Sequence, residues 1–229
     1  MTIRATTLSR AAGVAAVVAG LIFIGVQINH PPSDVTSVTT TEWAVRNSLK
    51  VAMAALGLAG ITGMYLRQVK QIGALGLLGY LVLGIGYLLI MSTAFVSAFV
   101  LPALAGTDPG YVNDVLAAGT NGTPIRDIGL LRGVIKLQGI AYLGGGLIFG
   151  MALYRARVLA RWAAAFLAVG GVVTVVLAVL PDAFYRFLAF PNGIAMIGLG
   201  YALWRTAGTG TTASPAGDHA ARLTTAGVE

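Results

Sequence analysis

The chain has no cysteine and few charged residues, and both absences narrow what it can be. Without cysteine it has no disulfide, no thiolate metal ligand, no cysteine nucleophile and no cysteine-linked lipid. Charged residues make up 10% of the chain and hydrophobic residues 57%, with a mean hydropathy of +0.83, whereas soluble domains carry about 25% charged residues. The composition predicts an integral membrane protein.

Carboxylates and histidines are also scarce, which argues against several kinds of membrane chemistry. All eight acids fall in predicted loops, termini or span edges, whereas proton-coupled transporters carry such groups within their spans. The two histidines, His30 and His219, do not form a haem or zinc ligand set. We therefore expect no cofactor, no metal and no catalytic residue, and the sequence leans against an enzyme.

Long apolar windows predict an all-α membrane protein with six transmembrane helices in one bundle. A helix needs about 20 apolar residues to cross ~30 Å of hydrocarbon, and continuous apolarity disfavours a strand barrel. The windows lie at 11–29, 47–66, 72–101, 132–154, 159–180 and 187–204, within a transmembrane domain at 11–205 that follows a cytoplasmic N-terminus at 1–10. Residues 206–229 are small and polar, and we expect a disordered cytoplasmic tail.

The first window has a competing interpretation as a cleaved signal peptide. Its basic start and apolar centre fit that interpretation, but QINHPPS at 27–33 lacks the small-residue cleavage pattern. An uncleaved first span is the favoured interpretation.

The placement of basic residues predicts the orientation, because short cytoplasmic loops retain lysine and arginine. One predicted side holds Arg4, Arg10, Arg67, Lys70, Arg155, Arg157, Arg161, Arg205 and Arg222. The other side holds fewer basic residues and most of the acids. Both termini are therefore predicted to be cytoplasmic, and anionic lipid head groups are the expected partner of the +7 net charge. The basic residues form no patch of the kind that binds nucleic acid.

Two outer helix ends repeat an Arg-x-x-x-Lys spacing, at Arg46–Lys50 and at Arg132–Lys136. Residues four apart share a helix face, so each pair forms a cationic stripe. The favoured interpretation is that these side chains snorkel to the head groups. The sharper one is a pocket for an anionic head group or carboxylate, and the third is a set of structural salt bridges. The candidate ligand-binding residues are Arg46, Lys50, Arg132, Lys136, Gln138, His30 and Arg186. The shared spacing also suggests a weak parallel repeat of spans 2 and 3 by spans 4 and 5.

Glycine is abundant, with 31 residues, many of them inside the predicted spans. Small residues three or four apart let helix backbones approach. Gly57, Gly60, Gly144, Gly146 and Gly150 are predicted to pack helices within the chain, with a homodimer seam as the alternative. Leucine is expected to be more damaging at Gly146 than at Gly193.

Three segments carry a family resemblance: SRAAGVAAVVAGLIFIG, GLIFGMALYRARVLARWAAAFLAVGGV and GYALWR. They resemble uncharacterised six-span bacterial membrane proteins grouped as a domain of unknown function. The resemblance implies a bacterial plasma (inner) membrane and the same six-helix plan, and it brings no activity.

Three function classes remain open from the sequence. The first is a non-enzymatic membrane protein that binds lipid or a small amphiphilic anion in its outer half. The second is a small transporter or transporter subunit, and the third is an integral membrane enzyme acting on lipid. A continuous polar cavity reaching the cytoplasmic side would favour the second.

Overall fold

The computed structural model describes residues 4–120, 122–177 and 189–208, and these residues form helices without any strand. The elements are α1 (Ala5–Gly25), α2 (Val35–Val38), α3 (Thr41–Arg67), α4 (Val69–Phe95), the π-helical turn η1 (Val96–Val100), α5 (Leu101–Leu104), α6 (Pro109–Gly119), α7 (Leu130–Ala156), α8 (Arg161–Leu177) and α10 (Ala189–Thr206). The all-α prediction is confirmed for this part of the chain. The predicted tail lies outside the described residues from 209 onward.

Four helical segments are long and apolar enough to cross a membrane: Ala5–Gly25, Thr41–Arg67, Val69–Leu104 and Leu130–Ala156. They correspond to the first four predicted spans. The fifth and sixth predicted spans coincide with α8 and α10, which have 17 and 18 residues. The chain is thus a membrane-type helical protein with four clear spanning segments.

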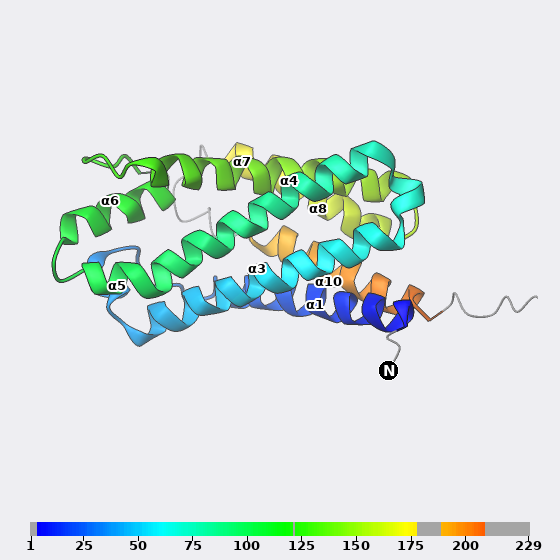
Figure 1. Ribbon diagram of the computed structural model, residues 1–229, viewed down its shortest axis with the longest axis horizontal. Helices are drawn as coiled ribbons and strands as arrows, with labels where there is room; N and C mark the ends of the chain where they lie inside the picture. Colours follow the sequence, from blue (N-terminus) through cyan, green and yellow to red (C-terminus); the bar gives the residue numbers. More distant parts are fainter. Residues whose placement is uncertain (1–3, 121, 178–188, 209–229) are drawn as a thin grey trace, which may run out of the picture.

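The long helices lie side by side along the long axis of the molecule (Figure 1). Around the bundle, α1 contacts α3, α3 contacts α4, α4 contacts α7, α7 contacts α8, α8 contacts α10, and α10 returns to α1. This order closes a ring of six helices. Each helix packs against its chain neighbours, and the first and last helices meet.

The two ends of the bundle differ in charge. The end that holds the described N-terminus also holds the α3–α4 and α7–α8 turns and the end of α10 (Figure 1). We call it the basic end, because it carries Arg4, Arg10, Arg67, Lys70, Arg155, Arg157, Arg161 and Arg205. The acids in the described residues all belong to segments of the opposite end: Asp34, Glu42, Asp108, Asp114 and Asp127.

The α3–α4 turn is tighter than the loop expected there. Gln68 ends α3 and precedes α4, and Gly73 inside the first turns of α4 has φ 60°. Glycine adopts this left-handed backbone without steric cost. The straight part of α4 therefore begins just after Gly73, close to the predicted start of the third span at 72.

The opposite end, which we call the cap end, carries α2, α5 and α6 (Figure 1). These short helices have a hydrophobic core of their own, separate from the main one, formed by Val38, Trp43, Leu101, Val112, Val115, Leu116 and Ile128. Helix α6 begins at Pro109, and the Asp108 side chain caps its first turn by accepting from the Tyr111 amide at 3.0 Å.

The third span does not end at residue 101 as predicted but continues to Leu104. The chain widens into η1 and continues as α5, with Pro102 in its first turn. In a π turn the amide of residue 102 would donate to the carbonyl of Ser97, five residues earlier, but proline has no amide proton. The indole Nε1 of Trp43 donates to that carbonyl at 2.9 Å instead. A side chain from α3 thus replaces the bond that Pro102 cannot make.

Glycines bring helix backbones together in the half near the basic end. A methyl group at Gly60 would lie 2.7 Å from Ala16 Cβ, one at Gly57 2.6 Å from Tyr87, and one at Gly150 2.6 Å from the Ala168 amide nitrogen. Since real Cβ atoms do not approach so closely, these three positions require glycine in this packing.

Gly144 and Gly146 pack less tightly than Gly150 on the same helix. Nothing lies within 4 Å of a methyl group at Gly144, and the nearest atom at Gly146 is the Leu167 carbonyl oxygen at 3.6 Å. Their neighbour Gly145 faces the backbone of Leu83 instead. Gly193 is more crowded than Gly146, because a methyl group at Gly193 would lie 2.6 Å from Ile24 and 3.0 Å from the Gly20 carbonyl.

Candidate functional site

A cavity of about 770 Å³ lies inside the cap end of the bundle. Its walls come from the segment that follows α1 and from α3, α4 and α7, with the carboxyl end of α6 beside them. Figure 1 shows α4 leaving α7 as it runs toward the cap end, where α6 bridges the two. The polar residues of the lining are Gln27, His30, Ser33, Asn47, Lys50, Thr93, Ser97, Thr120, Lys136 and Gln138.

Lys50 is held by two side chains of the cavity wall. Its Nζ lies 3.0 Å from His30 Nε2 and 3.3 Å from the Asn47 Oδ1 that accepts from it. His30 Nδ1 lies 2.8 Å from the carbonyl oxygen of Pro31. A carbonyl can only accept, so Nδ1 carries the proton and Nε2 of the neutral ring accepts from the ammonium group.

Trp43 contacts both residues that hold Lys50, namely His30 and Asn47. The two rings meet edge to face with centroids 5.9 Å apart, and Asn47 Nδ2 donates to the Trp43 carbonyl at 3.0 Å. Trp43 and Asn47 are both buried. Rigid neighbours of this kind fix the position of a charged side chain before any ligand arrives.

On the other wall, Thr93 of α4 and Gln138 of α7 are bonded to each other. The Thr93 hydroxyl donates to Gln138 Oε1 at 2.5 Å. The amide oxygen of Gln138 therefore points toward α4. The Nε2 group of the same amide keeps its two N–H donors. Lys136 lines the cavity two residues before Gln138.

The lining of the cavity carries several hydrogen-bond donors. Among the described lining residues there is no carboxylate. Asn47 Oδ1, His30 Nε2 and Gln138 Oε1 already accept hydrogen bonds. At the end of α6, the Leu116 and Ala117 carbonyls accept from Thr120 and from the Gly122 amide. Such a site is complementary to an acceptor that carries negative charge.

Four of the seven candidate residues line this cavity: His30, Lys50, Lys136 and Gln138. Arg132, one turn before Lys136, is exposed and is not part of the lining. Arg186 lies outside the described residues. The two Arg-x-x-x-Lys stripes thus send their lysines, and not their arginines, to the same cavity.

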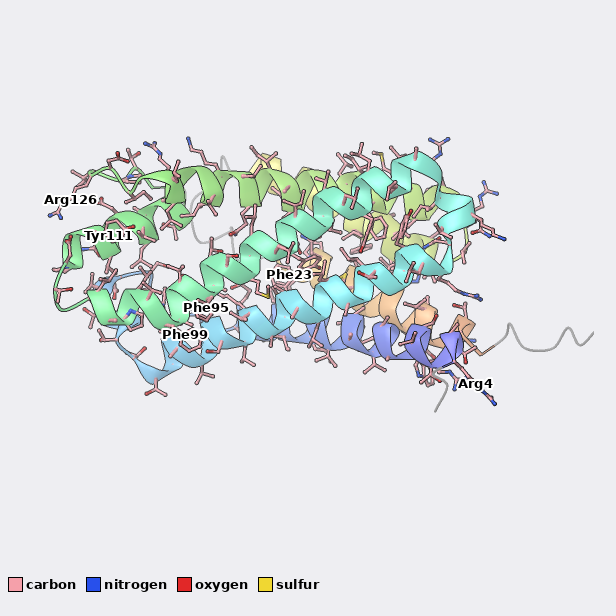
Figure 2. The ribbon with its side chains drawn as sticks, viewed as in Figure 1. Arg4, Phe23, Phe95, Phe99, Tyr111 and Arg126 are labelled. Carbon is pink, nitrogen blue, oxygen red and sulfur yellow. The ribbon has the colours of Figure 1, made fainter. Side chains whose placement is uncertain are left out.

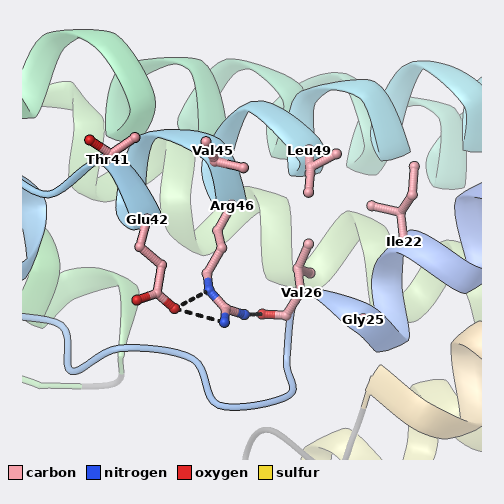
Figure 3. A pocket seen from close by; sticks show the side chains of 8 residues that line it. All are labelled: Ile22, Gly25, Val26, Thr41, Glu42, Val45, Arg46 and Leu49. Atoms are coloured by element: carbon pink, nitrogen blue, oxygen red, sulfur yellow. Dashed lines mark hydrogen bonds and ion pairs between the residues drawn. The ribbon is translucent and has the colours of Figure 1, made fainter.

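Arg46 faces a different, shallower hollow of about 420 Å³ between α1 and α3 (Figure 3). Its guanidinium bonds Glu42 at 2.8 Å and donates to the carbonyls of Val26 at 3.0 Å and Ile28 at 2.9 Å. These carbonyls end α1, where backbone acceptors lack helical partners. Arg46 thus joins α1 to α3, and its donors are already engaged.

Trp43, Asn47 and Thr93 are site residues that the sequence interpretation did not select. Trp43, Asn47 and Lys50 are spaced four and three apart, which places them on one helix face. This spacing could have indicated Trp43 and Asn47 as neighbours of Lys50. Thr93 gave no signal, because its role depends on the approach of α4 to α7. In the described part of the chain no three His, Asp or Glu side chains gather at a metal-binding distance.

Comparisons with protein-family models, with curated proteins and with solved structures find no match to this chain.

Proposed function

We propose that this chain is a six-span protein of the bacterial plasma membrane that binds an anionic amphiphile in its outer half. Four clear spans and two further helices in the same ring support the six-span plan. The basic end, without a described acid, supports cytoplasmic termini. A reporter fused after Arg205 is then expected to be cytoplasmic, and one inserted at Gly119 external; the opposite result would overturn the orientation.

The observation that carries the binding proposal is the donor-rich cavity. Lys50 and Lys136 both line this cavity, and Gln138 adds amide donors. The rest of the lining is largely apolar, with Ile90, Leu101 and Ile135 among its residues, so a purely polar anion would leave that surface uncovered.

Binding is favoured over transport because the lining residues all belong to the cap half of the bundle. The half toward the basic end is filled by fully buried side chains, among them Ile61, Leu83, Phe149, Leu153 and Leu199. Phe149 and Leu83 lie where α4 meets α7. A packed core of this density leaves no room for a continuous polar path through the described residues.

The test is the retention of an anionic lipid by the intact protein. Wild type, Lys50→Gln and Lys136→Gln are placed in nanodiscs of phosphatidylglycerol and phosphatidylcholine in equal parts, extracted gently and weighed by native mass spectrometry. Each exchange is expected to lower retained phosphatidylglycerol about tenfold, since a charge-assisted bond contributes about 1.5–3 kcal/mol.

Lys70→Gln is the matched control, because Lys70 is exposed at the basic end and the chemical change is the same. It is expected to retain as much lipid as the wild type. Equal retention in all four proteins, or equal loss in the control, would contradict the proposed site.

A further inference from the structure

The hollow between α1 and α3 that Arg46 borders is a groove on the outer surface of the bundle (Figure 3). It has a volume of about 420 Å³ and shares no lining residue with the larger cavity. Val45 and Leu49 of its wall are 52% and 41% exposed. Because they belong to a spanning helix, these apolar side chains face the bilayer.

The groove crosses the boundary between acyl chains and head groups. Helix α1 has 21 residues, about 31 Å of helix, which matches the ~30 Å of hydrocarbon in a bilayer. Its last residue, Gly25, lines the groove, so one edge of the hydrocarbon lies at this level. Ile22 and Leu49 line the groove on the hydrocarbon side. Thr41 and Glu42, at the start of α3, line it at the opposite end, on the head-group side (Figure 3).

The head-group end of the groove presents an open carboxylate oxygen. Arg46 donates to Glu42 Oε1 and to the carbonyls of Val26 and Ile28, and its side chain is 17% exposed. The Glu42 side chain is 55% exposed, and its Oε2 accepts no hydrogen bond from the described residues. A carboxylate oxygen of this kind is complementary to a cation that donates hydrogen bonds.

We propose that the groove binds a phospholipid with a primary ammonium head group, of the phosphatidylethanolamine type, from the leaflet around the cap end. The ammonium group donates to Glu42 Oε2, and one acyl chain lies along Val45, Leu49 and Ile22. Phosphatidylcholine has the same charges, but its quaternary ammonium has no N–H to donate. A water-soluble amine would leave the apolar wall of the groove uncovered. The site is separate from the anion cavity and does not depend on the proposed function.

Glu42→Gln tests the head group, because it removes the charge and keeps the shape of the side chain. Wild type and variant are placed in nanodiscs of phosphatidylethanolamine and phosphatidylcholine in equal parts and extracted gently. Native mass spectrometry then gives the ratio of the two retained lipids. Wild type is expected to favour phosphatidylethanolamine, and the ratio is expected to fall about threefold in the variant, as for an exposed ion pair.

Asp108→Asn is the matched control. Asp108 is also an exposed carboxylate of the cap end that pairs with an arginine, Arg126, at 3.0 Å, and it does not line the groove. Its lipid ratio is expected to equal that of the wild type. The same ratio in all three proteins, or an equal fall in both variants, would overturn the proposal.

Gly25→Leu tests the groove itself, because nothing lies within 4 Å of a methyl group at Gly25 and the longer side chain would occupy the groove. Retained phosphatidylethanolamine is expected to fall about tenfold, the loss expected when one or two chain methylenes are no longer buried. Gly144→Leu makes the same change where there is also room and outside the groove, and it should retain lipid like the wild type. Wild-type retention in Gly25→Leu would rule the groove out.

Two further readouts identify the occupant. A phosphatidylethanolamine with a photoreactive acyl chain is expected to label the peptides that contain Ile22 or Leu49, and less so in Gly25→Leu; labelling confined to other helices would contradict the site. A dimer in the native spectrum that Gly25→Leu dissociates would assign the groove to a second copy of the chain and overturn the lipid.

Discussion

Helices α4 and α7 meet differently in the two halves of the molecule, although glycines line both. Near the basic end, a methyl group at Gly79 would lie 2.5 Å from the Phe149 amide nitrogen, and in the middle of the bundle one at Gly86 would lie 2.7 Å from Tyr142 Cα. Near the cap end, Gly133 and Gly139 of α7 face open space. The same residue type packs directly against the neighbouring helix in one half and has no neighbour within 4 Å at these two positions in the other.

We infer that the half near the basic end mainly stabilises the fold and that the cap half holds the binding cavity. Backbone contact through glycine allows dense packing, and the largest fully buried side chains gather in the same half. The cap half has its own small core and holds the cavity between that core and the main one. Four substitutions would break or sharpen this comparison.

The largest effect is expected from Gly79→Leu. The new side chain would meet the backbone of Ile148 and Phe149, which cannot move aside as a side chain can, so α4 and α7 must separate. We expect a loss of about 3 kcal/mol or more in the free energy of unfolding, measured by thermal unfolding in detergent. Gly139→Leu is the matched comparison and is expected to unfold no earlier than wild type; similar losses in both would remove the contrast between the halves.

A smaller effect is expected from Gly193→Leu, which crowds Ile24 and the Gly20 carbonyl. Ile24 can change rotamer, so we expect a cost of about 2 kcal/mol. Gly146→Leu, with its nearest neighbour at 3.6 Å, should cost less. The same unfolding measurement decides, and a larger loss at Gly146 would restore the order expected from the small-xxx-small pattern.

Trp43→Phe is expected to cost about 1–2 kcal/mol, because it leaves the Ser97 carbonyl without its donor. The cost should shrink in a Pro102→Ala background, where residue 102 regains an amide proton that can serve that carbonyl. A double-mutant cycle of thermal unfolding measures this coupling. Additive losses would mean that the indole bond does not compensate for Pro102.

The smallest effect is expected from Glu42→Gln. Glu42 is exposed and pairs with Arg46 at 2.8 Å, and exposed ion pairs contribute about 0.2–1 kcal/mol. Arg46 keeps its bonds to the Val26 and Ile28 carbonyls, so α1 stays joined to α3. Added salt should reduce the difference from wild type. A loss that salt does not change would assign Glu42 a role beyond the ion pair.

The sequence by itself determined the helical class and the places of the long helices, because burying apolar length in a bilayer needs runs of a fixed size. It also separated the basic end from the acidic loops. The places of the long helices and of the charged residues both follow from the order of residues along the chain, which the sequence gives directly.

Only the tertiary structure decided which way each side chain turns. Arg46 and Lys50 lie one turn apart, yet Arg46 closes the end of α1 and Lys50 enters the cavity. Gly144 and Gly145 are adjacent, yet only Gly145 meets α4. Successive residues of a helix point about 100° apart, so neighbouring residues face different partners. A helix that is apolar on every side has no preferred face, and its packing against neighbouring helices decides which residues point inward.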